Sequence, residues 1–231
     1  MHLLAIDTAT MQVGVALGDA EELRGEVRLA GGRRHAEELA PAIRQLVEWT
    51  GIALDQLAAI AVGIGPGLFT GLRVGVTTAK VMAQALRIPV IPVVSLDLVA
   101  YPVRHTHRTI VAVLDARRRE VFHARYRPVP GGVQRVTDYA VESPADLIAD
   151  LEAAGDEVLL TGEGIAAHAE DFGALDRAEL AGPEFAFPST NALLTLAAAR
   201  YEREEFSTPW EVEPLYLRES DAELSWGAAR A

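Results

Sequence analysis

The chain has 231 residues, of which 50% are hydrophobic and 23% charged, with a formal net charge of −12. This composition is typical of a folded globular protein of one or two domains. Because the chain contains no cysteine, disulfides and thiolate metal sites are excluded, and a cytoplasmic location is expected. We find no signal peptide and no apolar run of the roughly 20 residues that span a bilayer, so we expect no membrane association.

The charge is unevenly distributed. Residues 1–110 carry ten basic and ten acidic side chains, whereas residues 111–231 carry 11 basic and 23 acidic ones. A protein that grips nucleic acid by itself needs a basic surface that releases counterions. The chain is therefore a poor stand-alone RNA binder, although a partner could supply the basic surface.

The first half of the chain alternates strand-like and helix-like segments. Hydrophobic periodicity predicts strands at 3–7, 12–17, 23–29, 57–64 and 89–94, a helix over 35–50, and a second helix that ends near residue 86. The first strand ends in Asp7, and a short turn leads into the second strand.

The second half repeats this order. We expect strands at 110–115, 121–127, 133–141 and 158–161, and a helix over 144–154, with Asp115 at the end of the first of these strands. A last helix over 191–200 has Ser189 as its expected N-cap, residues 210–218 are expected to be extended, and the tail beyond them is expected to be mobile. Because three elements recur in the same order, we interpret the chain as a duplication of two α/β lobes with mixed sheets. The expected domains are 1–105, which carries the partner-binding helices, and 106–231, which is acidic and whose C-terminal helix packs back on the first lobe.

The segment 65–75 holds four glycines in eleven residues, Gly-Pro-Gly-Leu-Phe-Thr-Gly-Leu-Arg-Val-Gly. It fits neither a Walker loop, which needs Gly-Lys followed by Ser or Thr, nor the Gly-x-Gly-x-x-Gly dinucleotide pattern. Its first three glycines are explained by a tight strand-to-helix turn. Two of the four, Gly71 and Gly75, would lie inside a helix at a cost of about 1 kcal/mol each against alanine, so a close approach is expected there.

Small residues recur every four positions along the expected helix, which gives it a ridge on which another helix could pack closely. Apolar side chains also occur on a second side, and a helix that is apolar nearly all round is buried on two sides. One side would face the domain's own core and the other a second chain; ordinary internal packing is the alternative. The predicted partner-interface residues are Gly71, Leu72, Val74, Gly75, Val76, Ala79 and Ala83.

Two lobes that each open with an aspartate between two strands resemble the actin-like (ASKHA, ribonuclease H-like) architecture. Five segments are similar to those of one bacterial branch, the TsaB (YeaZ) family, and they cover nearly the whole chain: 4–10, 34–41, 65–75, 114–122 and 214–218. The most specific of them is Gly-Pro-Gly-x-Phe-Thr-Gly-Leu-Arg.

This resemblance implies a role in making threonylcarbamoyladenosine next to the anticodon of tRNA. It implies that the paralogue TsaD is the transferase, that the ATPase TsaE is a third component, and that this chain is a non-catalytic scaffold. In isolation the partner-binding helix is expected to form a homodimer through a self-complementary patch. Contact with tRNA is expected only through the complex.

The catalytic paralogue carries two metal-binding histidines four residues apart on a helix. Here the corresponding helix offers His35, but position 39 is Leu39. A transition-metal site needs three or more converging ligands, and none can be assembled from local spacing. We therefore expect no metal, and a metalloprotease of the M22 type is an unfavoured alternative.

Asp7 and Asp115 are the candidate nucleotide-binding residues, because aspartates at these places hold Mg²⁺ and water near phosphates in ASKHA kinases. The other interpretation of Asp7 is that it caps the turn that follows it. An ASKHA-type ATPase or phosphotransferase that uses both aspartates is the main rival function. We expect no cofactor for this chain alone, and ATP or ADP with Mg²⁺ only at a joint site with the partner. A protein-stability or dormancy factor that uses the same apolar helix is a further alternative.

Two sets of basic residues stand out. Lys80 is the single lysine; it could reach a phosphate or a partner carboxylate, or end in solvent. Alternation along the second-half hairpin predicts one basic face that could touch tRNA phosphates or an acidic partner, or could be plain surface. That face would comprise Arg117, Arg119, His123, Arg125 and Arg127.

Overall fold

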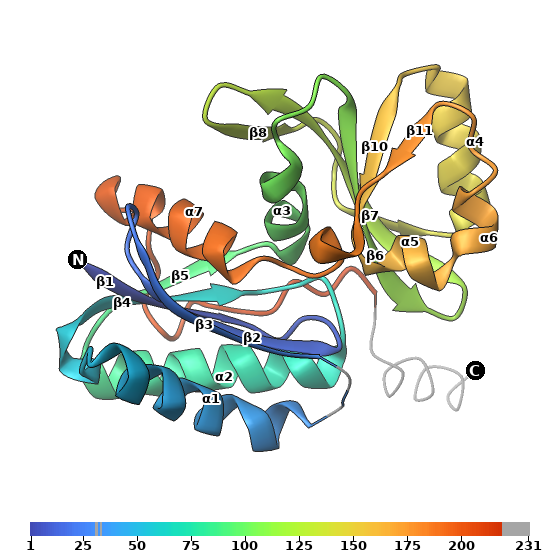
Figure 1. Cartoon of the computed structure of the whole chain (residues 1–231). Helices are drawn as coiled ribbons and strands as arrows, with labels where there is room; N and C mark the ends of the chain where they lie inside the picture. Colours follow the sequence, from blue (N-terminus) through green and yellow to red (C-terminus); the bar gives the residue numbers. More distant parts are fainter. Residues whose placement is uncertain (31, 33, 219–231) are drawn as a thin grey trace.

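Two mixed β-sheets, one from each half of the chain, form the frame of the molecule (Figure 1). The computed structural model describes residues 1–30, 32 and 34–218. The first sheet has the order β3-β2-β1-β4-β5. Its strands are β1 (His2–Asp7), β2 (Gln12–Gly18), β3 (Leu23–Ala30), β4 (Leu57–Gly63) and β5 (Val90–Val93).

Helices cover both faces of the first sheet. α1 (His35–Thr50) and α2 (Phe69–Leu86) lie on one face, and α7 (Thr190–Glu202) lies on the other (Figure 1). Along β1, Leu4 and Ile6 join the core under α1 and α2, whereas Leu3 packs with α7. Since successive side chains point to opposite faces, a sheet covered on both sides needs continuous hydrophobic strands, which β1 and β4 provide.

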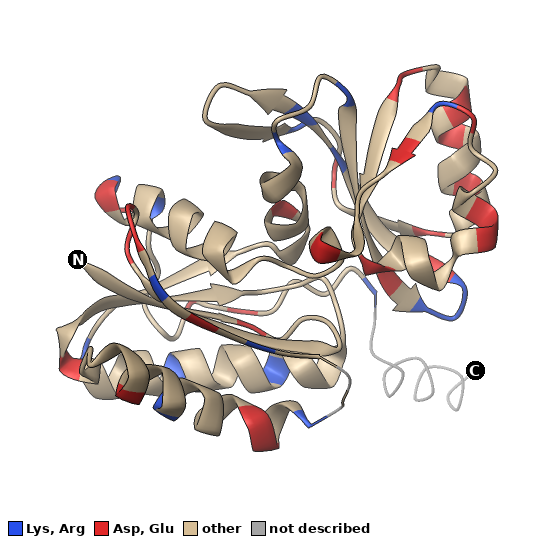
Figure 2. Ribbon diagram, in the orientation of Figure 1, with Lys and Arg blue, Asp and Glu red and all other residues tan. Residues whose placement is uncertain are grey.

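The second sheet has the order β11-β10-β6-β7-β8, with β9 also paired to β7. Its strands are β6 (Thr109–Arg117), β7 (Glu120–Val129), β8 (Gly132–Arg135), β9 (Ala140–Glu142), β10 (Val158–Thr161) and β11 (Ala178–Leu180). α3 (Ser95–Ala100) packs on one face, and α4 (Pro144–Ala154), α5 (Glu163–Ala167) and α6 (Ala169–Phe172) cover the other. Acidic side chains gather on α4 and α6, at the outer side of this lobe (Figure 2).

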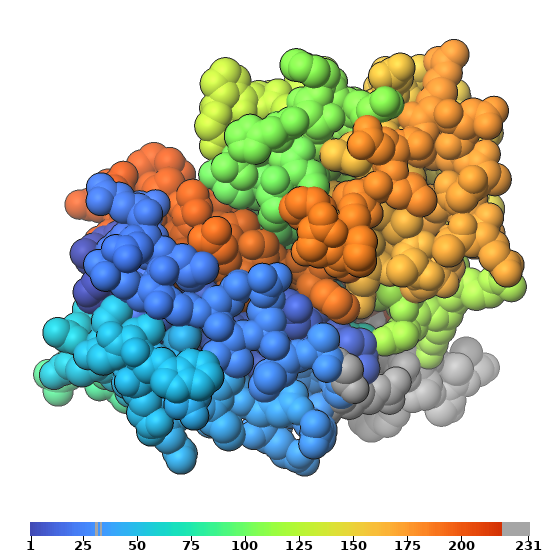
Figure 3. Space-filling view, viewed as in Figure 1, coloured from blue at the N-terminus to red at the C-terminus, as the bar shows by residue number. Residues whose placement is uncertain are grey.

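The two sheets have the same topology. In each, the strand that carries the aspartate at or near its end pairs with an antiparallel hairpin partner on one side and a parallel strand on the other. The repeat seen in the sequence is therefore real, and the predicted duplicated α/β fold is confirmed. α7 belongs to the second half of the chain by sequence, yet its residues pack against the strands of the first sheet (Figure 3).

Most of the predicted elements are confirmed, and the helices at 35–50 and 144–154 have the predicted bounds. Ser189 caps α7 by accepting a hydrogen bond from the backbone N–H of Ala192 at 3.1 Å. The single strand predicted at 133–141 is wrong, because Thr137 Oγ1 accepts from the Arg125 N–H in place of a backbone carbonyl and divides it into β8 and β9. α3 was not predicted, since six residues are too few to show a helical period.

Residues 210–218 form no strand; they run along the first lobe and reach the second lobe at Leu217 and Arg218. The tail predicted to be mobile lies outside the described residues. Within the part of the chain that the structure describes, no helix has the length and apolar character needed to cross a membrane.

The glycine-rich segment packs on the turn that follows Asp7. A Cβ added to Gly67 would lie 2.1 Å from the carbonyl oxygen of Ala9, and one added to Gly71 would lie 2.2 Å from that of Thr8. The Leu68 N–H donates to the Ala9 carbonyl at 2.7 Å, and Thr8 Oγ1 donates to the Gly71 carbonyl at 2.7 Å. These glycines therefore bring the start of α2 directly onto the turn.

Gly71→Ala should lower the free energy of unfolding by about 2–3 kcal/mol, because overpacking against a backbone atom outweighs the gain in helix propensity. Gly75→Ala should also destabilise the chain, since its Cβ would lie 2.2 Å from Thr8 Oγ1. Urea denaturation of both variants, alone and combined with Thr8→Ala, tests the cause. Thr8→Ala should reduce the loss of stability caused by Gly75→Ala, because that clash is with the Thr8 side chain. It should leave the loss caused by Gly71→Ala unchanged, because that clash is with the Thr8 backbone. A Gly71→Ala protein as stable as the wild type would contradict this packing.

Candidate functional site

Asp7 lies inside the first lobe, with only 3% of its surface exposed. Its Oδ1 accepts the backbone N–H of Ala9 at 3.1 Å, and its Oδ2 accepts the hydroxyl of Ser95 at 3.0 Å. Thr8 and Thr10 are as deeply buried as Asp7. The structure thus matches the turn-capping interpretation of Asp7, and its carboxylate does not line the cleft between the lobes.

His35 also holds this turn in place. The first residue of α1, it is buried, and its Nε2–H donates to the Thr10 carbonyl at 2.8 Å. A metal-binding role for this imidazole nitrogen would break that bond. Among the described residues, no group of three His, Cys, Asp or Glu side chains is arranged to hold a metal ion.

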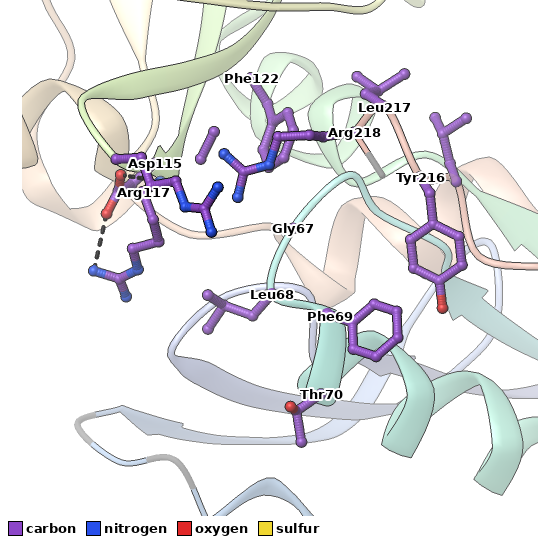
Figure 4. A pocket seen from close by; sticks show the side chains of 13 residues that line it. Gly67, Leu68, Phe69, Thr70, Asp115, Arg117, Phe122, Tyr216, Leu217 and Arg218 are labelled. Carbon is purple, nitrogen blue, oxygen red and sulfur yellow. Dashed lines mark hydrogen bonds and ion pairs between the residues drawn. The ribbon is translucent and has the colours of Figure 1, made fainter. Parts of the chain in front are cut away.

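Asp115 occupies the equivalent place in the second lobe and makes the equivalent turn. Its Oδ1 accepts the Arg117 N–H at 2.8 Å, and its Oδ2 lies 3.0 Å from the Arg117 guanidinium. Unlike Asp7, it lines a cleft of about 420 Å³ between the two lobes (Figure 4). The first aspartate turn is therefore closed and the second is open, so the structure does not bring the two carboxylates together in one cavity.

Two further titratable residues lie near Asp115. Burial, and then the charge of Asp115, raise the pKa of Glu163 at the start of α5 to about 7. His168 Nε2 lies 3.8 Å from Asp115 Oδ1, which is an ion-pair distance when the imidazole is protonated. Neither residue could be identified from the sequence, because the segment after β10 brings them to Asp115 only in the folded chain.

Six of the seven predicted partner-interface residues are buried within the chain itself: Gly71, Leu72, Gly75, Val76, Ala79 and Ala83. Gly71 and Gly75 face the Thr8 turn, while Val76, Ala79 and Ala83 join the core between α2 and the first sheet. Val74 alone is half-exposed. The small-residue ridge therefore packs internally in the monomer, which was the alternative interpretation, and a charge placed on Val76 or Ala79 would disrupt the core.

α2 presents a different face outward. Its exposed residues are Phe69, Thr70, Arg73, Thr77, Val81, Gln84 and Ala85. Val81 is 60% exposed, a large fraction for an apolar side chain. Two grooves, of about 500 and 480 Å³, flank this face. Ala36 of α1 lines the first, and Glu213, Pro214 and Tyr216 line the second. The face of α2 that is open to a partner is thus the one opposite the small-residue ridge.

The predicted basic face does not form. The hairpin turn interrupts the alternation, so Arg117 and Arg119 lie at the exposed tip, whereas His123 is buried against Glu142 at 2.7 Å. Arg125 lies 3.7 Å from Asp150, and burial lowers the pKa of His123 to about 4. The Nζ of Lys80 donates to the Val212 carbonyl at 2.9 Å and ties the C-terminal segment to α2.

The duplicated two-lobe fold is that of actin-like (ASKHA) proteins. The ethanolamine utilization protein EutJ of Carboxydothermus hydrogenoformans aligns with a TM-score of 0.50 at 9% identity over 86% of this chain and 89% of that chain, a likeness that shows the fold alone. A family model described as "TsaD: tRNA N6-adenosine threonylcarbamoyltransferase" matches residues 28–226.

Relatives of similar length show to which family within this fold the chain belongs. TsaB of Haemophilus influenzae is 32% identical, with 98% of this chain and 96% of the relative covered, and TsaB of Escherichia coli is 28% identical over 96% of both. The structure of YeaZ from Pseudomonas aeruginosa has a TM-score of 0.81 at 31% identity, over 94% of this chain and 99% of that chain. The chain belongs to the TsaB (YeaZ) family of tRNA threonylcarbamoyladenosine biosynthesis proteins, which is related to TsaD. The family resemblance seen in the sequence is confirmed.

The burial of Asp7 has a measurable consequence for stability. Burial raises the pKa of Asp7 from 3.8 to about 6 in the folded state. The folded chain therefore binds this proton more tightly than the unfolded chain, and stability falls as pH rises through about 6. Asp7→Asn mimics the protonated form, so it should be more stable than the wild type by about 1–3 kcal/mol at pH 7–8 and similar to it near pH 4.

Chemical denaturation from pH 4 to 8 measures this difference. Asp19→Asn is the matched control, because the backbone N–H groups of Glu21 and Glu22 lower the pKa of Asp19. That substitution should act in the opposite direction and cost stability above pH 4. Parallel pH profiles for the wild type and Asp7→Asn would contradict the burial of a carboxylate here.

Proposed function

We propose that the chain is a non-catalytic partner of a TsaD-type transferase, needed for threonylcarbamoylation of the adenosine next to the tRNA anticodon in the cytoplasm. The burial of the turn from Asp7 to Thr10 beneath residues 67–75 carries this proposal. In an ASKHA kinase the equivalent turn must face the phosphates. Here the start of α2 occupies that space, so phosphates cannot reach the turn without displacing the helix.

The state of the two aspartates supports the same conclusion. Phosphoryl transfer requires carboxylates that place Mg²⁺ and water against the phosphate. Asp7 is engaged by Ser95 and by the Ala9 N–H, and Asp115 is paired with Arg117. We therefore propose that the chain needs no nucleotide of its own, and that ATP or ADP with Mg²⁺ binds only at a joint site with the partner.

The outward face of α2 is the proposed docking surface for the TsaD homologue. Exposed Val81 and half-exposed Val74 provide apolar area, and the grooves on both sides of α2 can take the side chains of a partner helix. Without that partner, the same face would pair with a second copy of the chain about a two-fold axis. The TsaE component and tRNA are proposed to join only this complex.

Thr77→Glu combined with Val81→Glu should weaken binding to the TsaD homologue at least tenfold, because a carboxylate desolvated in an apolar interface is costly. Both positions are exposed, so the thermal midpoint of the monomer should change little. Calorimetric titration measures the affinity, and Val136→Glu, at an exposed valine of the second lobe, is the matched control. Unchanged affinity of the double variant would place the interface elsewhere.

Reconstitution tests the function itself. The TsaD homologue, TsaE, tRNA and threonylcarbamoyl-adenylate are combined with and without this chain, and modified adenosine is measured by mass spectrometry. Modification should require the chain and should survive Asp7→Asn and Asp115→Asn, because neither carboxylate takes part in the chemistry.

The ATPase rival makes the opposite prediction. Modification that fails with Asp7→Asn, or turnover of ATP with Mg²⁺ by the isolated chain, would show that the aspartates act on phosphate. Modification that proceeds without the chain would point to another binding role, such as a stability or dormancy factor.

A further inference from the structure

The β6–β7 hairpin turns through three consecutive arginines in the left-handed region. The φ angles of Arg117, Arg118 and Arg119 are 63°, 55° and 62°. Arg117 pairs with Glu120 across the hairpin, so Arg118 and Arg119 are its two loop residues. Asn-Gly is the favoured pair in such a turn, because both positions need positive φ. Large side chains are kept here against a backbone preference, which is the pattern expected of residues selected for contact with a ligand.

This arginine turn borders the cleft between the lobes. Arg117 and Arg218 lie on one side of it, and the rings of Phe69 and Tyr216 lie across from them (Figure 4). Arg118 also lines the cleft. The ring centroids are 5.3 Å apart with an interplanar angle of 35°. Phe69 is 39% and Tyr216 45% exposed. The Arg73 guanidinium lies 4.2 Å from the centroid of Phe69 and covers one face of that ring, so Tyr216 offers the more open surface to a planar ligand. The cleft thus combines guanidinium groups with a stacking platform.

Arg117 and Arg218 are each held by an ion pair and keep further N–H donors for a ligand. Arg117 is paired with Asp115 at 3.0 Å and Arg218 with Glu120 at 2.7 Å. A guanidinium has five N–H donors, so one pairing of this kind leaves others for a phosphate. The rest of the second lobe is acidic (Figure 2), which makes this turn a local basic site in a chain that otherwise repels polyanions.

We propose that the cleft binds one unstacked nucleotide of a single-stranded segment of the tRNA. Its phosphate would lie on the arginine turn and its base on the rings of Tyr216 and Phe69. Exposed aromatic rings next to arginine are the usual means of holding single-stranded RNA, and a volume of about 420 Å³ suits one nucleotide and excludes a duplex. The inference rests on the proposed function, since the chain's charge of −12 leaves the main grip on tRNA to the partner.

Two observations favour RNA over other anions. The Asp115 carboxylate lines the same cleft and would repel the concentrated charge of a free nucleoside triphosphate more than a phosphodiester with one charge. The cleft also shares Phe69 and Thr70 with the groove on the outward face of α2, so RNA held by a partner docked there is within reach.

The test replaces the two loop residues of the hairpin by Asn-Gly, the pair that this type of turn favours. Arg118→Asn combined with Arg119→Gly should raise the thermal midpoint of the chain, because the backbone preference is now met. In complex with the TsaD homologue, the same variant should bind tRNA about tenfold more weakly, with a salt dependence of log K reduced by about 1–2 units. Fluorescence anisotropy with labelled tRNA at several salt concentrations measures both.

A second variant separates stacking from charge. Tyr216→Ala should weaken tRNA binding by about tenfold while leaving the salt dependence unchanged, since stacking releases no counterions. Because Tyr216 also lines a groove of the proposed docking surface, light scattering at the concentrations of the titration must show that this variant is fully assembled with the partner. Arg24→Gln combined with Arg28→Gln is the charge-matched control on β3, outside the cleft, and should have little effect.

Three outcomes would overturn the inference. In the first, the arginine-turn variant assembles with the partner, as seen by light scattering, and binds tRNA unchanged. In the second, the control on β3 loses as much affinity, so that only net charge matters. In the third, ADP with Mg²⁺ saturates the cleft at micromolar concentration and displaces the RNA. If the wild-type chain forms no complex with the TsaD homologue, the proposed function fails, and titration of the chain alone with the same RNA at low salt decides the inference separately.

Discussion

The contact between the glycine-rich segment and the Asp7 turn positions most of the first lobe. Gly67 and Gly71 let the chain approach the Ala9 and Thr8 carbonyls, and Gly75 lets α2 approach the Thr8 hydroxyl. Two hydrogen bonds close the contact. From the other side, His35 fixes the start of α1 on Thr10, and Ser95 fixes the start of α3 on Asp7. Three helices therefore begin at one buried turn, and their outward faces follow from it.

The same contact explains why the glycines are kept although they suit no phosphate loop. Two glycines inside a helix cost about 1 kcal/mol each, and the bonds and burial gained at the turn offset that cost. This packing also explains why α2 is apolar on two sides. One side fills the core of the first lobe, while the other remains outside with grooves along it.

Much of the fold could be predicted from the sequence because it rests on local periodicity. The bounds of α1 and α4 follow from apolar spacing and from end signals such as Gly51 and Gly155, both of which have positive φ. The orientation of α2 could not be predicted, because spacing shows that Gly71 and Ala79 share a face but not which neighbour that face meets. The cleft could not be predicted either, since it joins Phe69, Asp115 and Tyr216 from three distant segments.

The two aspartate turns occupy equivalent places in the two lobes, but only the Asp115 turn is open to the cleft. The C-terminal segment holds the two lobes in this arrangement. After Ser207 pairs with Val90, the segment runs along α2, where Lys80 binds Val212, and the Leu215 N–H donates to the Ile64 carbonyl at 2.7 Å. Arg218 then reaches Glu120 of the second lobe. Closure of the lobes around a nucleotide would have to strain or break these bonds along with the contacts of α2. A chain tied in this way suits a fixed surface for partners better than the hinged cleft of a kinase.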